Sequence, residues 1–270
     1  MTTEKNKSAD DQFMEMPFMQ HFIELRARLF YVAVGFVIAF GISFHYAGHV
    51  YDFLARPLID AMIANGHSNP HMIFTGIAEA FFTHLKLAMW MGLFITLPLL
   101  LSQVWMFVAP GLYKNEKRAF LPFLIATPIL FLMGAAMAYY VVFPMAWKFF
   151  LSYETIGTAD GLPIQLEAKV NEYLSIVTGL LMAFGFCFEL PVLLVLLNKV
   201  GLIMAQTLAE SRRYAIVLIL IVAAIVTPPD VISQLMLAIP MYFLYEISVW
   251  ICIAQEKAAG KRELIAANKS

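Results

Sequence analysis

Six long runs of uncharged residues are the feature that most restricts what this chain can fold into. Most of them are at least about 20 residues long, which is the length that an α-helix needs to cross the hydrocarbon core of a bilayer. The chain is 61% hydrophobic and only 14% charged, which is outside the range of soluble domains. The runs are continuous rather than alternating, and this excludes a β-barrel. They cover Leu29–Tyr51, Leu87–Ala109, Ala119–Trp147, Tyr173–Asn198, Tyr214–Val226 and Val231–Gln255, with Glu189 inside the fourth and Glu246 inside the sixth.

The Lys and Arg residues are distributed unevenly when the runs are threaded as six consecutive spans with the N-terminus in the cytoplasm. Fourteen of the 18 then lie on the cytoplasmic side, and the four on the outer side are Arg56, Lys86, Lys148 and Lys169. An excess of Lys and Arg is typical of cytoplasmic loops and sets the orientation of the chain. The sequence therefore predicts an all-α integral membrane protein with six transmembrane helices and both termini in the cytoplasm.

The six helices are predicted to form one membrane domain, residues 17–254, between two cytoplasmic tails. Residues 1–16 are polar at first and are expected to be disordered, and residues 255–270 form the second tail. Pro17 opens a stretch in which apolar residues recur at helical spacing. This stretch predicts an N-terminal amphipathic helix on the cytoplasmic membrane surface that runs into the first span.

Proline and turn residues predict irregular segments. The first outer loop is expected at residues 50–76, where Pro57 and an Asn-Gly pair are turn signals. The third span contains three prolines, more than a straight helix tolerates, at Pro122, Pro128 and Pro144.

The fifth span is unusually short. Only thirteen uncharged residues separate Arg213 from Thr227, and at about 1.5 Å per residue they reach only about 20 Å. Spans 5 and 6 are therefore predicted to be short, so that the bilayer thins beside them or the protein shields that edge.

Glu189 is the strongest single functional signal. A charge near the centre of a membrane helix costs on the order of 3 kcal/mol, so such residues usually face a cavity or a partner. Pro191, two residues later, frees a backbone carbonyl one turn earlier in the helix. A protonated carboxyl hydrogen-bonded inside the bundle is the structural alternative, and a role in binding is the favoured interpretation.

Other polar residues near the membrane leave alternatives open. Thr227 and Gln234 flank the outer turn, where they either join helices of different chains by hydrogen bonds or simply cap the Pro-Pro turn. Glu246 is expected to have a structural role. Glu24 and Glu116 are carboxylates on a face dominated by cations, and composition alone favours an ordinary pair between Glu24 and Arg28, four residues apart.

Catalytic and metal-binding patterns are mostly missing from the sequence. There is no H-E-x-x-H, G-x-S-x-G or P-loop motif. His45 and His49 have metal spacing without further ligands nearby, so an interfacial pair is the better interpretation. The basic residues are scattered along a membrane face and give nucleic-acid binding no support. We therefore expect no enzyme activity and no cofactor.

Five motifs in one order resemble the TatC family, the large polytopic subunit of the twin-arginine protein translocase. The resemblance covers the chain from about Phe18 to Ala254. The matching segments are His21–Arg28, Ala55–Leu58, Gln103–Lys114 with Glu116, Phe184–Pro191 and Thr227–Gln234.

The resemblance implies a receptor in the bacterial cytoplasmic (inner) membrane. Such proteins recognise twin-arginine signal peptides on folded cargo and recruit single-span TatA-like and TatB-like subunits, besides other copies of themselves, for export driven by the proton-motive force. It implies that Glu24 and Glu116 contact the arginine pair, a role that suits carboxylates because they bind guanidinium groups in a bidentate way. The implied roles of the remaining residues are peptide binding for Arg26, Phe107 and Tyr113, an intramembrane groove at Glu189, and partner-helix docking at Thr227 and Gln234.

A proton-coupled secondary transporter of a small solute, with Glu189 as the titrating group, is the main alternative. Transporters of that kind usually show repeat symmetry and paired broken helices, and neither is apparent in the sequence. An intramembrane hydrolase is disfavoured because nucleophile–base pairs are missing.

Overall fold

The computed structural model describes residues 4–112, 121–155, 162–227 and 231–267. Side chains are described within this part for residues 23–104, 122–155, 162–227 and 231–258. The described elements are α1 (Glu4–His45), α2 (Ala47–Ala64), α3 (Glu79–Leu112), α4 (Leu121–Met137), the π-helical turn η2 (Ala138–Val142), α5 (Phe143–Leu151), α6 (Val170–Phe188), α7 (Leu190–Lys199), α8 (Ala205–Glu210), α9 (Arg212–Val226) and α10 (Val231–Ala267).

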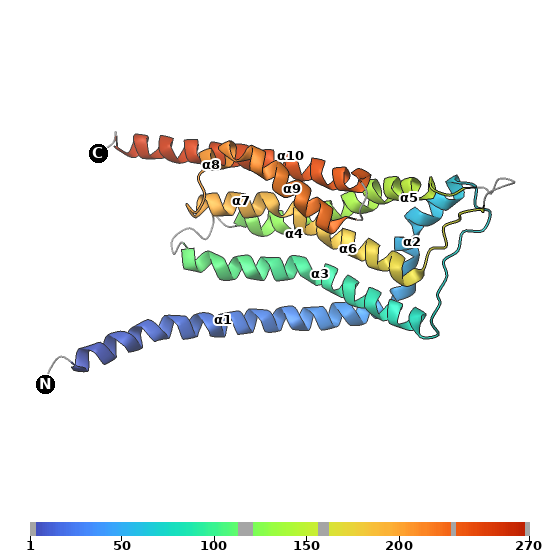
Figure 1. The fold of residues 1–270 in the computed structure, drawn as a ribbon. Coiled ribbons are helices and arrows are strands. Elements are labelled where there is room, and N and C mark those ends of the chain that lie inside the picture. The colour runs from blue at the N-terminus through green and yellow to red at the C-terminus, as the bar shows by residue number, and fades with distance from the viewer. Residues whose placement is uncertain (1–3, 113–120, 156–161, 228–230, 268–270) are drawn as a thin grey trace.

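The long helices run side by side, with both chain termini at one end of the molecule and α2 with the long loops at the other (Figure 1). Helix α1 packs against α3, α4 packs against α6, and α10 packs against α7 and α9. This arrangement agrees with both termini on one side of a membrane. In the described part of the chain, β-structure is limited to two isolated bridges between loop residues, Ile73 with Lys169 and Thr155 with Ile164.

Within the described residues, five segments are long and apolar enough to cross a membrane: Ile23–His45, Glu79–Val104, Pro122–Leu151, Val170–Lys199 and Val231–Ala258. Helix α9, with 15 residues, is the short fifth span that the sequence predicts. Helix α10 contains the sixth span and continues without a break through the polar segment to Ala267.

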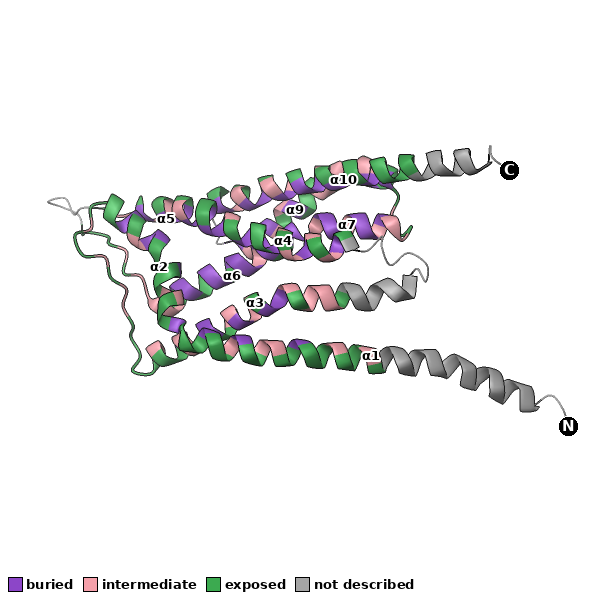
Figure 2. Ribbon diagram, turned by 180° about the vertical axis from the view of Figure 1, so that it is seen from behind, coloured by how far each residue is buried: buried purple, intermediate pink, exposed green. Residues whose placement is uncertain are grey.

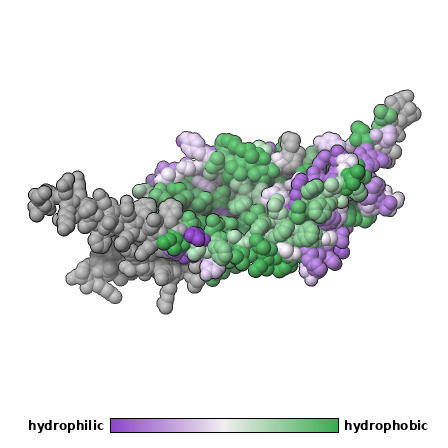
Figure 3. Space-filling model, turned by 90° about the horizontal axis from the view of Figure 1, so that it is seen from below, coloured by the Kyte–Doolittle hydropathy of each residue, from purple (hydrophilic) through white to green (hydrophobic). Residues whose placement is uncertain are grey.

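The surface of the helices is apolar, as expected for contact with lipid. Figure 2 shows exposed residues along the outer faces of α1 and α10, whereas buried residues gather on α6 and α7. The segment Val170–Lys199 is the most buried of the five, and Ile23–His45 is the least buried. Figure 3 shows apolar side chains over the middle of the molecule and hydrophilic ones at the loop end. The α6–α7 segment is therefore the centre of the bundle.

Two segments expected to lack regular structure are helical. Helix α1 begins at Glu4, inside the predicted tail, and continues as one helix through the predicted surface helix into the first span. Helix α2 occupies much of the predicted outer loop, with Pro57 inside it. It forms because Leu54, Leu58 and other buried residues follow a helical period on one face. The Asn-Gly turn signal ends this helix.

Prolines and glycines shape the centre of the bundle. The third span is interrupted by the η2 turn, after which Pro144 lies in the first turn of α5, so the expectation of a non-straight helix is confirmed. Glycines allow α4 and α6 to approach closely. A Cβ atom on Gly134 would collide with the carbonyl of Phe184, and one on Gly185 would collide with the ring of Phe131.

Candidate functional site

Glu24 lies on α1 and already binds a guanidinium group. Its Oε1 accepts hydrogen bonds from Arg28 Nη2 at 2.6 Å and Arg28 Nε at 3.1 Å. Arg28 Nη1 also donates to Gln103 Oε1 on α3 at 3.1 Å. The Glu24 side chain remains 41% exposed, whereas that of Arg28 is 18% exposed. The pair expected from the four-residue spacing is therefore present, and it connects the cytoplasmic ends of α1 and α3.

The other peptide-binding candidates are only partly visible. Arg26 is exposed, and its side chain makes no ion pair with any residue that the structure describes. Phe107 belongs to the backbone of α3, but its side chain lies outside the described residues, and Tyr113 and Glu116 lie wholly outside them. Gln103 is one turn before Phe107 on α3. Its bond to Arg28 therefore brings Glu24 close to the end of α3 that contains the Phe107 backbone.

Glu189 lies at a break in the fourth span. It is the residue between α6 and α7, and Pro191 occupies the first turn of α7, where its missing N–H is tolerated. Glu189 is 8% exposed, and both carboxyl oxygens are buried without a hydrogen-bond partner among the residues that the structure describes. The Thr127 hydroxyl on α4 is a neighbour of this carboxyl group.

Thr227 and Gln234 make hydrogen bonds within the chain. Thr227 Oγ1 donates to the carbonyl of Ala223 at 2.8 Å, and Gln234 Nε2 donates to the carbonyl of Leu220 at 3.1 Å. Gln234 therefore connects α10 to α9 across the outer end of the short helix. The residues of the Pro-Pro turn, 228–230, lie outside the described part of the chain.

Two carboxylates of α10 form structural contacts with α7, α8 and α9. Glu246 accepts hydrogen bonds from Arg212 Nε at 2.7 Å and Nη2 at 3.2 Å, and from the Tyr242 hydroxyl at 2.9 Å. These bonds agree with its expected structural role. Glu256 accepts from Asn198 Nδ2 and from the N–H of Ala205, both at 2.7 Å, a contact that sequence reasoning missed. A polar residue in a predicted tail gives no signal of such a partner.

A second missed cluster lies at the outer end. Glu154 accepts hydrogen bonds from Asn65 Nδ2 at 2.6 Å and from the N–H of Leu166 at 2.9 Å, and its Oε2 is 2.9 Å from His67 Nε2. Burial raises the pKa of the Glu154 carboxyl, but the hydrogen bonds from His67, Leu166 and Asn65 outweigh it and hold the pKa below its ordinary value. Among the described residues, no group of three or more His, Cys, Asp and Glu is arranged to hold a metal ion.

Comparison with known proteins identifies the family. The family model described as Sec-independent protein translocase protein (TatC) matches residues 20–240. The chain belongs to the TatC family. As a TatC protein it is a component of the Sec-independent protein translocase, a multi-pass protein of the bacterial cytoplasmic membrane, and a transport subunit rather than an enzyme.

Relatives and a solved structure support this assignment over nearly the whole chain. The TatC protein of Magnetococcus marinus is 42% identical over 253 residues, 94% of this chain and 90% of that protein. The TatC protein of Escherichia coli strain K12 is 40% identical over 234 residues, 87% of each chain. A crystal structure of the twin-arginine translocase receptor TatC in the detergent DDM matches with a TM-score of 0.71 at 37% identity, and the match covers 86% of this chain and 99% of that one.

Proposed function

We propose that this TatC protein is the receptor for twin-arginine signal peptides, and that the peptide binds at the cytoplasmic ends of α1 and α3. The observation that carries the proposal is the Glu24 carboxylate, which holds the guanidinium group of Arg28 while 41% of its side chain is exposed. The Glu24 carboxylate therefore lies next to the end of α3, can bind a guanidinium group, and is accessible to a signal peptide.

In this proposal, an arginine of the signal peptide takes over hydrogen bonds to Glu24 that Arg28 makes in the free protein. An arginine of the peptide binds the exposed side of Glu24, and Arg28 keeps its hydrogen bond to Gln103. Arginine is preferred to lysine because its planar group donates two parallel hydrogen bonds to one carboxylate. Glu116 supplies the carboxylate for the second arginine in this proposal, with Arg26, Phe107 and Tyr113 around the peptide.

The apolar part of the signal peptide and the partner subunits are assigned to the membrane region. The proposal places the apolar segment in a groove at Glu189, whose unpartnered carboxyl group is a candidate for a hydrogen bond from a guest helix. TatA-like and TatB-like single-span subunits dock near Thr227 and Gln234, beside the short α9. Folded cargo is then exported at the expense of the proton-motive force.

Photocrosslinking in membranes tests the recognition step. Probes at positions 22, 107 and 113 are expected to crosslink a twin-arginine peptide and to lose the signal when both arginines are replaced by lysine. Glu24→Gln should weaken capture by about ten- to a hundredfold, because a hydrogen bond to a charged group contributes roughly 1.5–3 kcal/mol. Glu210→Gln, on the exposed surface of α8, is the matched control and should have no effect.

Equal crosslinking of the two peptides, or unchanged capture by Glu24→Gln, would contradict the receptor proposal. The proton-coupled transporter then becomes the leading candidate, because the buried carboxyl of Glu189 lacks a hydrogen-bond partner. Uptake of a small solute by the purified protein alone in liposomes, abolished by Glu189→Gln, would support that alternative.

A further inference from the structure

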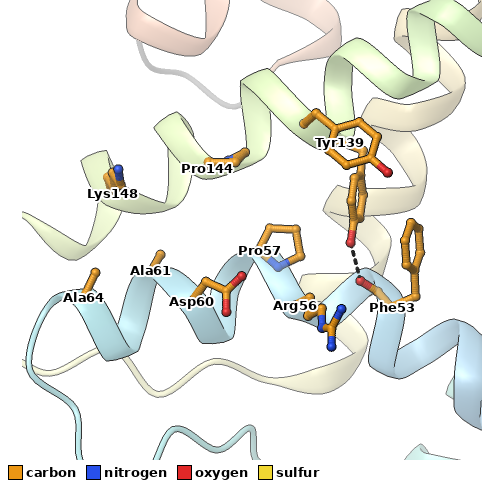
Figure 4. Close-up of a pocket in the computed structure, with 10 residues that line it drawn as sticks. Phe53, Arg56, Pro57, Asp60, Ala61, Ala64, Tyr139, Pro144 and Lys148 are labelled. Atoms are coloured by element: carbon orange, nitrogen blue, oxygen red, sulfur yellow. Dashed lines mark hydrogen bonds between the residues drawn. The ribbon is translucent and has the colours of Figure 1, made fainter.

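A cavity of about 470 Å³ opens at the outer end of the molecule between α2 and α5 (Figure 4). Two of its charged side chains, Arg56 and Asp60, come from α2, and the third, Lys148, comes from α5. Phe53 and Tyr139 form part of the apolar wall. Two of the four cations on the outer side thus meet at one cavity, although they lie far apart in the sequence.

The three charged side chains are exposed. Among the residues that the structure describes, none of Arg56, Asp60 and Lys148 forms a side-chain ion pair, not even Arg56 with Asp60 one turn away. The cavity therefore carries an excess of positive charge with donors free to bind an anion. The Asp60 carboxylate repels an anion with several charges. It can also accept a hydrogen bond from a ligand that has a donor group.

A second cavity, of about 220 Å³, adjoins the first and is lined by apolar and aromatic residues. The two share Phe53, Tyr139 and Tyr140 as walls. The Phe53 and Tyr139 rings stack with centroids 4.4 Å apart, and the Tyr139 hydroxyl donates to the carbonyl of Phe53 at 2.7 Å, so the shared wall is firmly held. Leu132 lines the second cavity and lies about 12 Å deeper along the helix than Tyr140, at about 1.5 Å per residue.

We propose that the two cavities together bind one phospholipid of the outer leaflet. Its phosphodiester lies between Arg56 and Lys148, and one acyl chain occupies the apolar cavity. Depth supports this assignment, because Lys148 is in the last turn of the Pro122–Leu151 span, where headgroups meet the hydrocarbon. A free anion would leave the apolar cavity without an occupant, and an apolar helix would leave the cations without one.

Native mass spectrometry of the detergent-purified full chain tests the headgroup part. Phosphatidylglycerol is expected to bind more tightly than diacylglycerol with the same acyl chains. Replacing Arg56 and Lys148 by Gln should weaken phosphatidylglycerol binding about fivefold for each cation, following the roughly 1 kcal/mol that a Lys or Arg contributes near a lipid surface. Lys169→Gln removes an outer-side cation that pairs with Glu172 instead, and it should leave binding unchanged.

The apolar part has its own variant. Ala136→Phe fills the second cavity and should reduce binding of phosphatidylglycerol, whereas Met133→Phe, on the same helix but outside the cavity lining, should not. Equal binding of both lipids, an equal loss in Lys169→Gln, or no effect of Ala136→Phe would overturn the proposal. Full displacement of the lipid by inorganic phosphate would also overturn it, because it would identify a site for the free anion. None of these variants alters the proposed peptide-binding residues.

Discussion

At the residue scale, the buried carboxyl group of Glu189 destabilises the fold, and a role in binding would explain why it is there. The turn that holds it follows from Pro191, and both carboxyl oxygens are buried without a hydrogen bond. A buried polar group without a partner costs about 1–3 kcal/mol. Such groups are few in native proteins, and a functional role is one of the reasons for which they are kept. The position therefore fits a site that is completed by a guest helix.

Replacing this carboxyl by an apolar side chain of similar shape should stabilise the isolated protein. Glu189→Met is expected to raise the free energy of unfolding by about 1–2 kcal/mol, because it removes an unsatisfied group from the interior. The change is measured as a higher Tm of the purified protein in detergent, with impaired export in cells. Leu193→Met, at a half-exposed position of α7, should change neither. A lower Tm in Glu189→Met would show that the carboxyl has a partner that it stabilises.

At the element scale, α9 is too short to cross a bilayer by itself and depends on its attachment to α10. Gln234 fixes its outer half, and the bidentate pair between Arg212 and Glu246 fixes its cytoplasmic end. Glu246→Ala should cost about 2 kcal/mol, in the range for hydrogen bonds to charged groups, and lower the Tm. The exchanged pair Arg212→Glu with Glu246→Arg should recover part of the loss. A double variant no more stable than Glu246→Ala would show that the pair itself does not hold α9.

The elements that the sequence predicted well are those fixed by hydropathy. The spans, the short α9 and the irregular third span follow from apolar length and from proline, which act locally. Helix α2 was missed because Pro57 reads as a turn signal, although a helix that buries one face tolerates it. Glu24 with Arg28 was predictable from spacing, whereas Gln103 as their third partner depends on how α1 packs against α3. Glu116, Tyr113 and the Phe107 side chain, outside the described residues, remain predictions.

At the scale of the whole molecule, the two ends are held together differently. Segments far apart in sequence are joined at the outer end by the hydrogen bonds of Glu154 and by those of Ile73 with Ala168 and Val170. Within the described part of the cytoplasmic end, α1 is joined to α3 by the side-chain bond between Arg28 and Gln103. The proposed binding of a peptide at Glu24 would leave these outer-end hydrogen bonds in place, because none of them involves α1.

The stability that the Glu154 hydrogen bonds give to the outer end should decrease at acidic pH. Because hydrogen bonds hold the folded-state pKa of Glu154 below its ordinary value of 4.5, the stabilisation is complete above that value and is lost as pH falls through the lower folded-state pKa. At neutral pH, Glu154→Gln should lower the free energy of unfolding by about 1 kcal/mol, since it removes the charge while keeping the shape.

The Tm curves of the two proteins, measured from neutral to strongly acidic pH, should converge below the ordinary pKa of a Glu carboxyl group. Glu167→Gln, an exposed neighbour, should follow the unsubstituted protein throughout. A difference between Glu154→Gln and the unsubstituted protein that persists unchanged into acid would show that the carboxylate charge does not hold the outer loops together.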